Sequence, residues 1–169
     1  MLGFYENFPE GVHRIDFFTS SLQNRKLQQR LIRVISEINR QTFSFEEVAN
    51  PTVPDCAVIF EVGIADAKNF NYVDAEETKK ALNALKKEAF RVMDFFCAVR
   101  YYKTTAEKKT PLKFDYYMIR FLFSRDVVEM RVFHERGPRY VSPEDITAFM
   151  VKAVNKASAK KLLKPFEPV

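Results

Sequence analysis

Apolar and polar residues recur along the chain with two different periods, and these periods predict its secondary structure. Residues 11–18 alternate with a period of two, with His13, Ile15 and Phe17 on one side, as expected of a strand. Residues 22–40 place apolar side chains at helical spacing and basic side chains opposite them. This second pattern predicts an amphipathic helix with a basic exterior.

The middle of the chain predicts further strands and a second helix. Residues 42–48 fit a short strand, and residues 56–65 are almost continuously apolar, which is typical of a central strand. Asp74 is placed to cap the helix that follows it. The segment Asp94–Thr104 fits either a continuation of that helix or a strand. We prefer a strand, because the next segment needs an antiparallel partner.

The last third predicts a hairpin and a helix. The hairpin joins residues 112–123 to residues 127–135 through a short turn, and the helix runs from Ser142 to about Leu163. The complete order is β-α-β-β-α-β-β-β-α. It predicts an α+β fold whose mostly antiparallel sheet of five to six strands is covered by three amphipathic helices.

Length and composition favour an ordinary globular protein. With 169 residues, 47% hydrophobic and 29% charged, we expect a single α+β domain over residues 1–169, including an arm (1–10) and a tail (165–169). No apolar run approaches the roughly 20 residues of a membrane span, and the N-terminus does not resemble a secretory signal. The two cysteines, Cys56 and Cys97, lie apart in apolar segments. We therefore expect a cytoplasmic protein with free thiols and no membrane partner.

Few residues indicate catalysis or metal binding. Two histidines and two cysteines lack the spacing of zinc ligands, and four glycines are too few for a phosphate-binding loop, so we expect neither metal nor cofactor. Glu61 interrupts an apolar strand, where an ion pair with an arginine such as Arg120 or Arg131 is the simplest explanation. A small-molecule enzyme whose pocket contains Glu61, His134 and Arg136 remains the third hypothesis.

Basic residues provide the broadest signal. The net charge is +5, which favours polyanions without requiring one. The candidate anion-binding residues lie on the first helix, on the last helix and after the last strand: Lys26, Arg30, Arg33, Arg136, Arg139, Lys152, Lys156 and Lys160. A further cluster surrounds the predicted loop near Tyr101 and Tyr102: Arg100, Lys103, Lys108, Lys109 and Lys113. The leading hypothesis is a non-enzymatic module that binds RNA or another polyanion through phosphate contacts and stacking.

Aromatic strand residues support a different hypothesis, a homodimeric protein-interaction scaffold. The chain contains 17 Phe and 7 Tyr, and aromatic residues are common interface anchors. The expected anchors are Phe114, Tyr116 and Phe133, or Tyr117 and Phe121 on the alternate face.

The stretch HERGPRYVSPED, residues 134–145, is the densest candidate for an anion-binding turn. Its second half is a helix start, with Ser142 as N-cap and acidic residues in the first turn. We expect its two arginines to pair with nearby acids, namely Glu135, Glu144 or Asp145. We therefore favour a structural role for residues 134–145 over a ligand-binding site.

Overall fold

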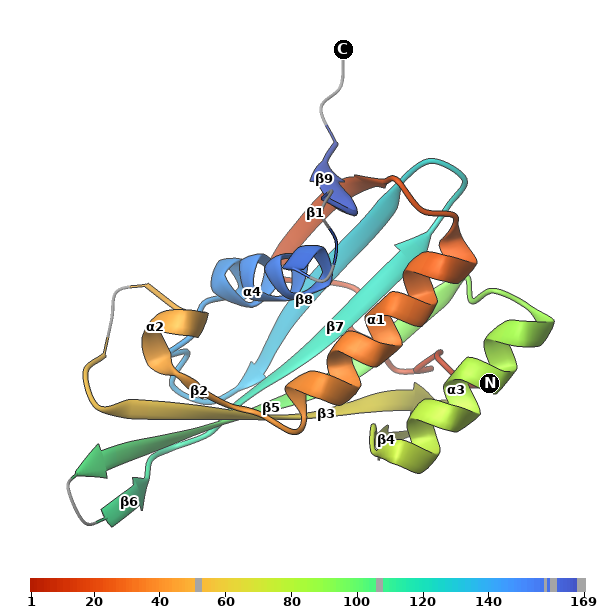
Figure 1. Cartoon of the computed structure of the whole chain (residues 1–169). Coiled ribbons are helices and arrows are strands. Elements are labelled where there is room, and N and C mark those ends of the chain that lie inside the picture. The colour runs from red at the N-terminus through yellow and green to blue at the C-terminus, as the bar shows by residue number, and fades with distance from the viewer. Residues whose placement is uncertain (51–52, 106–107, 157, 159–160, 167–169) are drawn as a thin grey trace.

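The computed structural model describes residues 1–50, 53–105, 108–156, 158 and 161–166 (Figure 1). Within this part of the chain, nine strands form one sheet in the order β2-β3-β5-β7-β8-β1-β9, with β4 paired to β3 and β6 paired to β5. All pairings between these strands are antiparallel. The α+β class and the mostly antiparallel sheet are thus confirmed, with more strands than the sequence predicts.

The described elements follow one another in an order that places a helix after the first strand and another after the last hairpin. They are β1 (Arg14–Ser20), α1 (Asn24–Ile38), β2 (Thr42–Ser44), α2 (Phe45–Val48), β3 (Cys56–Asp66), β4 (Asn69–Tyr72), α3 (Ala75–Lys87), β5 (Val92–Thr105), β6 (Lys108–Pro111), β7 (Asp115–Phe123), β8 (Val128–Arg136), α4 (Pro143–Lys156) and β9 (Leu163–Pro165).

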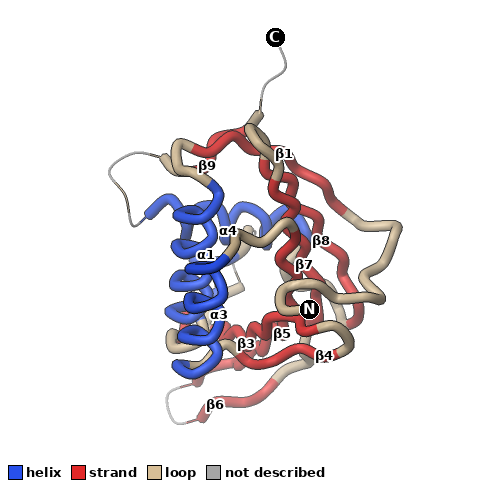
Figure 2. Tube along the Cα trace, turned by 90° about the vertical axis from the view of Figure 1, so that its right-hand side faces the viewer, coloured by secondary structure: helices blue, strands red, loops and turns tan. Residues whose placement is uncertain are grey.

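Helices α1, α3 and α4 lie together on one side of the sheet (Figure 2). The core fills the space between these helices and the inner face of the sheet. Leu31 and Ile35 of α1 pack there with Phe60 of β3 and Ile119 of β7, and all four side chains are almost fully buried. Burial of this apolar surface is the main force that holds the two layers together.

The two helix starts and the ambiguous segment are as predicted. The amide of Glu77 donates to Asp74 Oδ1 at 2.9 Å, and the amide of Asp145 donates to Ser142 Oγ at 3.0 Å, so both caps are made. Strand β5 includes the whole of Asp94–Thr104 and pairs with both β3 and β7. A central position between two strands explains why this segment is a strand.

Two short elements differ from the predictions. The strand predicted for residues 42–48 ends at Ser44, where a capping box with Glu47 begins the four-residue helix α2. The amide of Ser44 donates to Glu47 Oε2 at 2.7 Å, and this local bond outweighs the apolar alternation. The polar connection after β3 contains strand β4, which pairs with residues 63–66.

The last helix is shorter than predicted. It ends at Lys156, and the amides of Leu162 and Leu163 donate to Asn155 Oδ1 at 2.9 and 2.8 Å. These bonds fold the chain back, and β9 then pairs with β1 at the edge of the sheet. The predicted tail therefore begins inside a strand, at Pro165.

Candidate functional site

The sheet face opposite α1, α3 and α4, which we call the outer face, carries a line of aromatic side chains. Because side chains alternate along a strand, Phe95 and Cys97 of β5 enter the core, whereas Phe96 points to the outer face. Successive rings along the line have centroids 4.6, 5.5, 5.7 and 6.2 Å apart. We call this line the aromatic track, and in order it consists of Tyr5, Phe70, Phe96, Tyr116 and Phe114.

Arg136 joins the aromatic track because the pairing of β7 with β8 is irregular. Tyr117 pairs with His134, but the register then shifts, so that Tyr116 pairs with Arg136 instead of Glu135. The Arg136 guanidinium lies over the Tyr116 ring, with its carbon 4.8 Å from the ring centroid. Such bulges redirect side chains. Because of the bulge, the Arg136 guanidinium lies beside the Tyr116 ring, where regular pairing would place the Glu135 carboxylate.

A second arginine lies at the Phe114 end of the track. The Arg100 guanidinium carbon is 5.0 Å from the Phe114 ring centroid, and Arg100 Nε is 2.7 Å from Glu61 Oε1. Glu61 thus pairs with Arg100 and not with Arg120 or Arg131, whose carboxylate partners are Asp94 and Glu129. Both side chains of the Glu61–Arg100 pair remain partly exposed, so the pair contributes little to stability and leaves the cation accessible.

Beyond Phe114 the sheet continues into a basic hairpin. Strand β6 pairs only with the end of β5, and the two extend away from the helices in Figure 1. Its lysines are exposed, and we call this group the lysine hairpin: Lys103, Lys108, Lys109 and Lys113. This end of the sheet therefore carries rings and two arginines on the outer face and, in the hairpin beyond them, a set of exposed lysines.

A buried carboxylate organises the loop after β8. Asp115 is fully buried and accepts hydrogen bonds from the Tyr101 hydroxyl at 2.6 Å and from the amides of Arg139 and Tyr140 at 2.6 and 2.9 Å. The ring Nε2 of His134 lies 2.8 Å from Asp115 Oδ1. Sequence reasoning missed this residue, although an aspartate at an inward position of an apolar strand was a usable signal.

Residues 134–145 therefore have a structural role: the end of β8, the loop 137–142 and the start of α4 pack around Asp115. Gly137 has φ +116°, and a Cβ there would overlap the Phe114 carbonyl oxygen and the Asp115 carboxylate. Arg139 has φ +61°, the left-handed region that non-glycine residues seldom occupy. The loop is shaped by these backbone turns, and the expected arginine pairing is wrong within the described residues: neither arginine forms an ion pair with Glu135, Glu144 or Asp145.

Glu61 and His134 do not share a pocket. Glu61 lies on the outer face, whereas His134 pairs with the buried Tyr117 and faces inward toward Asp115. Burial, with the adjacent Asp115 charge, raises the pKa of Tyr117 far above its ordinary range. The three residues of the predicted pocket therefore lie on different faces of the sheet: Glu61 and Arg136 on the outer face, and His134 on the inner face.

The basic helix residues occupy separate surfaces. Lys26 and Arg33 are exposed on α1, Arg30 is half-buried beside them, and Lys152 and Lys156 are exposed on α4. Arg136 and Arg139 lie at the end of β8 and in the loop that follows it, and Lys160 falls outside the described residues. Of these candidates, the structure joins only Arg136 to the aromatic track.

The expected interface anchors divide in the same way. Phe114, Tyr116 and Phe133 are half-buried on the outer face, while Tyr117 and Phe121 lie in the core with 0% and 2% exposure. Tyr117 and Phe121 are therefore unavailable as anchors, because their strand positions face the helices. Sequence alternation alone does not tell which face the helices cover.

Across the described residues, the side chains offer no grouping of three or more His, Cys, Asp or Glu suited to a metal ion. Nor does any helix in that part of the chain combine the length and the apolar character needed to cross a bilayer. Cys56 and Cys97 are both free and buried, and burial raises the pKa of Cys97 to about 12. The thiols therefore have a packing role.

Comparisons of the chain with protein-family models, with curated proteins and with solved structures gave no match. The candidate site consequently rests on its own geometry: an aromatic track, two arginines that lie over its rings, and the lysine hairpin at one end.

Proposed function

We propose that this chain binds single-stranded RNA along the aromatic track and the lysine hairpin. The observation that carries the proposal is the Tyr116 ring, which contacts Phe96 and Phe114 on the outer face while the Arg136 guanidinium carbon lies 4.8 Å from its centroid. Sheet faces with exposed rings and arginine side chains are typical platforms for unpaired bases.

Each part of the surface matches one part of a nucleotide. Base faces stack on Tyr116 and Phe114, and the planar guanidinium groups of Arg100 and Arg136 offer both stacking and phosphate contacts. The lysine hairpin supplies charge for the backbone without a defined sequence preference. The net charge of +5 and the exposed Lys26 and Arg33 on α1 add long-range attraction for a polyanion.

Fluorescence anisotropy with a labelled oligouridine tests the proposal. Changing Tyr116 to Ala should weaken binding roughly five- to 150-fold, the cost of one lost stacked base. The matched control is Phe17→Ala, because Phe17 is an exposed ring on the outer side of β1, 47% exposed and outside the track. Equal affinity of both variants and the unchanged chain, or no binding at low salt, would refute the proposal.

Salt dependence separates the lysines from the rings. Changing Lys108 and Lys109 together to uncharged residues should make the slope of log affinity against log salt less negative by about 1.4, because each phosphate contact on a single strand contributes about 0.7. Tyr116→Ala should leave this slope unchanged. Duplex RNA of the same length should bind more weakly, since paired bases cannot stack on the track.

A homodimeric scaffold is the second candidate function, and exposed apolar side chains at the β1 edge favour it. Ile15 and Phe17 are each 47% exposed on the outer face. Phe166, whose backbone amide donates a hydrogen bond to the Phe17 carbonyl oxygen, is 43% exposed. Apolar groups grouped in this way are typical of interaction surfaces. A strict monomer at high concentration in light scattering would exclude this homodimer.

The proposal also includes a compartment. We place the protein in the cytoplasm, supported by two buried thiols that remain free. Detection of a tagged chain in a membrane or secreted fraction would contradict this placement.

A further inference from the structure

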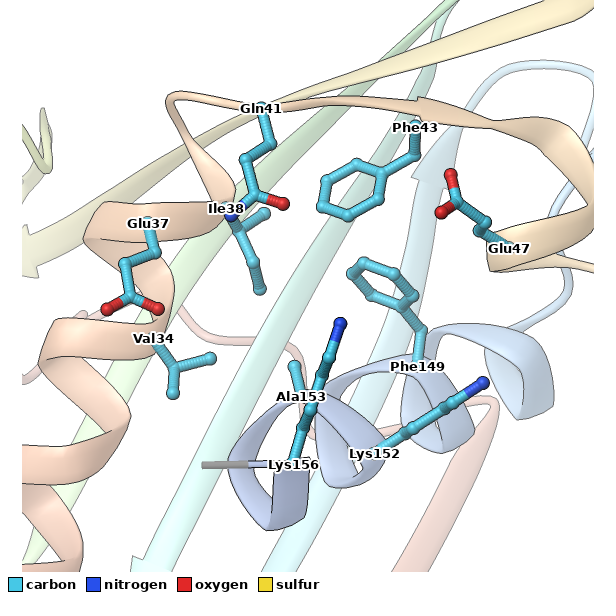
Figure 3. A pocket seen from close by; sticks show the side chains of 10 residues that line it. All are labelled: Val34, Glu37, Ile38, Gln41, Phe43, Glu47, Phe149, Lys152, Ala153 and Lys156. Carbon is cyan, nitrogen blue, oxygen red and sulfur yellow. The ribbon is translucent and has the colours of Figure 1, made fainter. Parts of the chain in front are cut away.

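A cavity lies on the helical side of the molecule, far from the outer face, between α1, β2, α2 and α4. Its volume is about 350 Å³, at the small end of the range for ligand sites (Figure 3). Buried apolar side chains, among them Val34, Ile38 and Phe149, form its floor, whereas its rim is polar and exposed. An apolar floor under a charged rim is the usual composition of a small-molecule pocket.

The aromatic part of the cavity is held rigidly. Phe43 and Phe149 point into it, with ring centroids 5.1 Å apart and planes at 87° (Figure 3). Phe149 in turn stacks on Phe60 of the central strand β3, at 4.9 Å and 14°. Because Phe149 is held against the sheet by Phe60, binding a ligand should need little reorganisation of this ring.

The charges at the rim are asymmetric. Lys152 and Lys156 lie one turn apart on α4, and neither forms an ion pair with a residue that the structure describes. Figure 3 shows the Lys156 amine reaching toward the two rings. On the opposite rim, Glu47 Oε2 already accepts hydrogen bonds from the amide and hydroxyl of Ser44. The unpaired charge at the α4 rim is therefore positive.

We infer that this cavity binds a small amphiphilic monocarboxylate, with its apolar body over Phe43 and Phe149 and its carboxylate at the Lys156 amine, on the rim that also carries Lys152. A carboxylate that accepts hydrogen bonds from the Lys156 ammonium gains a charge-assisted contact, and the charge of Lys152, one turn away on the same helix, adds to the attraction. Glu37 at the α1 rim disfavours a second carboxylate, which excludes dicarboxylates. This site is independent of the RNA proposal, because it lies on the other side of the sheet.

Titration with octanoate, followed by NMR chemical shifts of the whole chain, tests the inference. Octanoate should bind saturably at one site, with shifts at Phe43 and Phe149, and at least about tenfold more tightly than octan-1-ol or octylamine. Preference for octylamine would show that the carboxylates dominate the rim and would overturn the inference, as would equal binding of all three compounds.

Two kinds of variant complete the test. Changing both Lys152 and Lys156 to Gln should abolish the preference for octanoate over octan-1-ol, whereas Lys26→Gln on α1 should leave it unchanged. Changing Ala153, at the cavity wall, to Phe should fill the space and prevent binding of all three compounds without altering any charge. Tyr116→Ala should affect RNA and not octanoate, so the two proposals can fail separately. Octanoate binding that survives Ala153→Phe would place the ligand elsewhere and refute the site.

Discussion

Asp94 and Arg120 form a buried ion pair on the outer face, beneath the N-terminal segment. Arg120 Nε donates to Asp94 Oδ1 at 2.7 Å and the terminal nitrogen donates to Oδ2 at 2.8 Å, while the Asp94 side chain is fully buried. The amide of Tyr5 donates to the same Oδ2 at 2.7 Å, and the rings of Phe4 and Phe8 face the guanidinium. The pair therefore attaches the first residues of the chain to the sheet.

Replacing Asp94 by Asn should destabilise the chain strongly, by about 3–5 kcal/mol, because it leaves Arg120 buried without its counter-charge. Chemical denaturation followed by circular dichroism measures the loss. The matched control is Asp16→Asn, which breaks the Arg14–Asp16 pair, whose side chains are 38% and 21% exposed. That change should cost no more than about 1 kcal/mol. Similar losses in the two variants would show that the N-terminal segment is not held by Asp94.

Replacing Asp115 by Asn should also destabilise the fold, by roughly 1.5–3 kcal/mol for each charge-assisted bond that is lost. The new NH2 group would replace one of the two oxygens and would face the backbone amide of either Arg139 or Tyr140, which then lacks an acceptor. Urea denaturation measures the change, and Glu135→Gln on the exposed end of β8 is the control. If Asp115→Asn is as stable as the control, the loop does not depend on the carboxylate.

The two glycines Gly137 and Gly11 allow a direct test of backbone conformation. Gly137→Ala should cost more than about 1 kcal/mol, since φ is +116° and a Cβ would overlap Phe114 and Asp115. Gly11→Ala should be close to neutral, because no heavy atom lies within 4 Å of its added Cβ. Thermal unfolding of the two variants side by side gives the comparison, and a neutral Gly137→Ala would contradict the described loop.

His13 should make stability depend on pH in a defined direction. Partial desolvation, followed by electrostatic interactions with Arg139 and His134, lowers the pKa of His13 below its ordinary value of 6.5 in the folded chain. As the pH falls below about 6.5, the unfolded chain binds the proton first, so the free energy of unfolding decreases until the folded pKa is passed. Above that range the contribution is fully present.

Geometry supports the same direction. His13 Nδ1 accepts a hydrogen bond from the amide of His134 at 2.9 Å, and a protonated Nδ1 has no lone pair to accept it. Urea midpoints measured between pH 8 and pH 5 should fall less steeply for His13→Gln than for the unchanged chain. Identical slopes would show that His13 titrates alike in the folded and unfolded states.

The candidate site was predictable only in part, for reasons visible at single residues. The basic character near Lys108 and Lys109 and the strand alternation that exposes Tyr116 are local properties, and the sequence shows both. Arg136 reaches Tyr116 only through a register shift between two strands, which no local pattern reports. The role of Asp115 is equally hidden from local patterns, because the backbone amides that donate to its carboxylate belong to Arg139 and Tyr140, more than twenty residues later.

By itself, the sequence determined the α+β class and the starts of α3 and α4, because periodicity and capping act over a few neighbouring residues. It left Asp94–Thr104 open between helix and strand, and pairing with β3 and β7 makes this segment a strand. Only the tertiary structure decided which sheet face the helices cover, where the last helix stops, and which residues meet on the aromatic track. These features depend on contacts between segments distant in the chain: β9 with β1, and β7 with β5 and β8. Such contacts form only when the whole sheet is assembled.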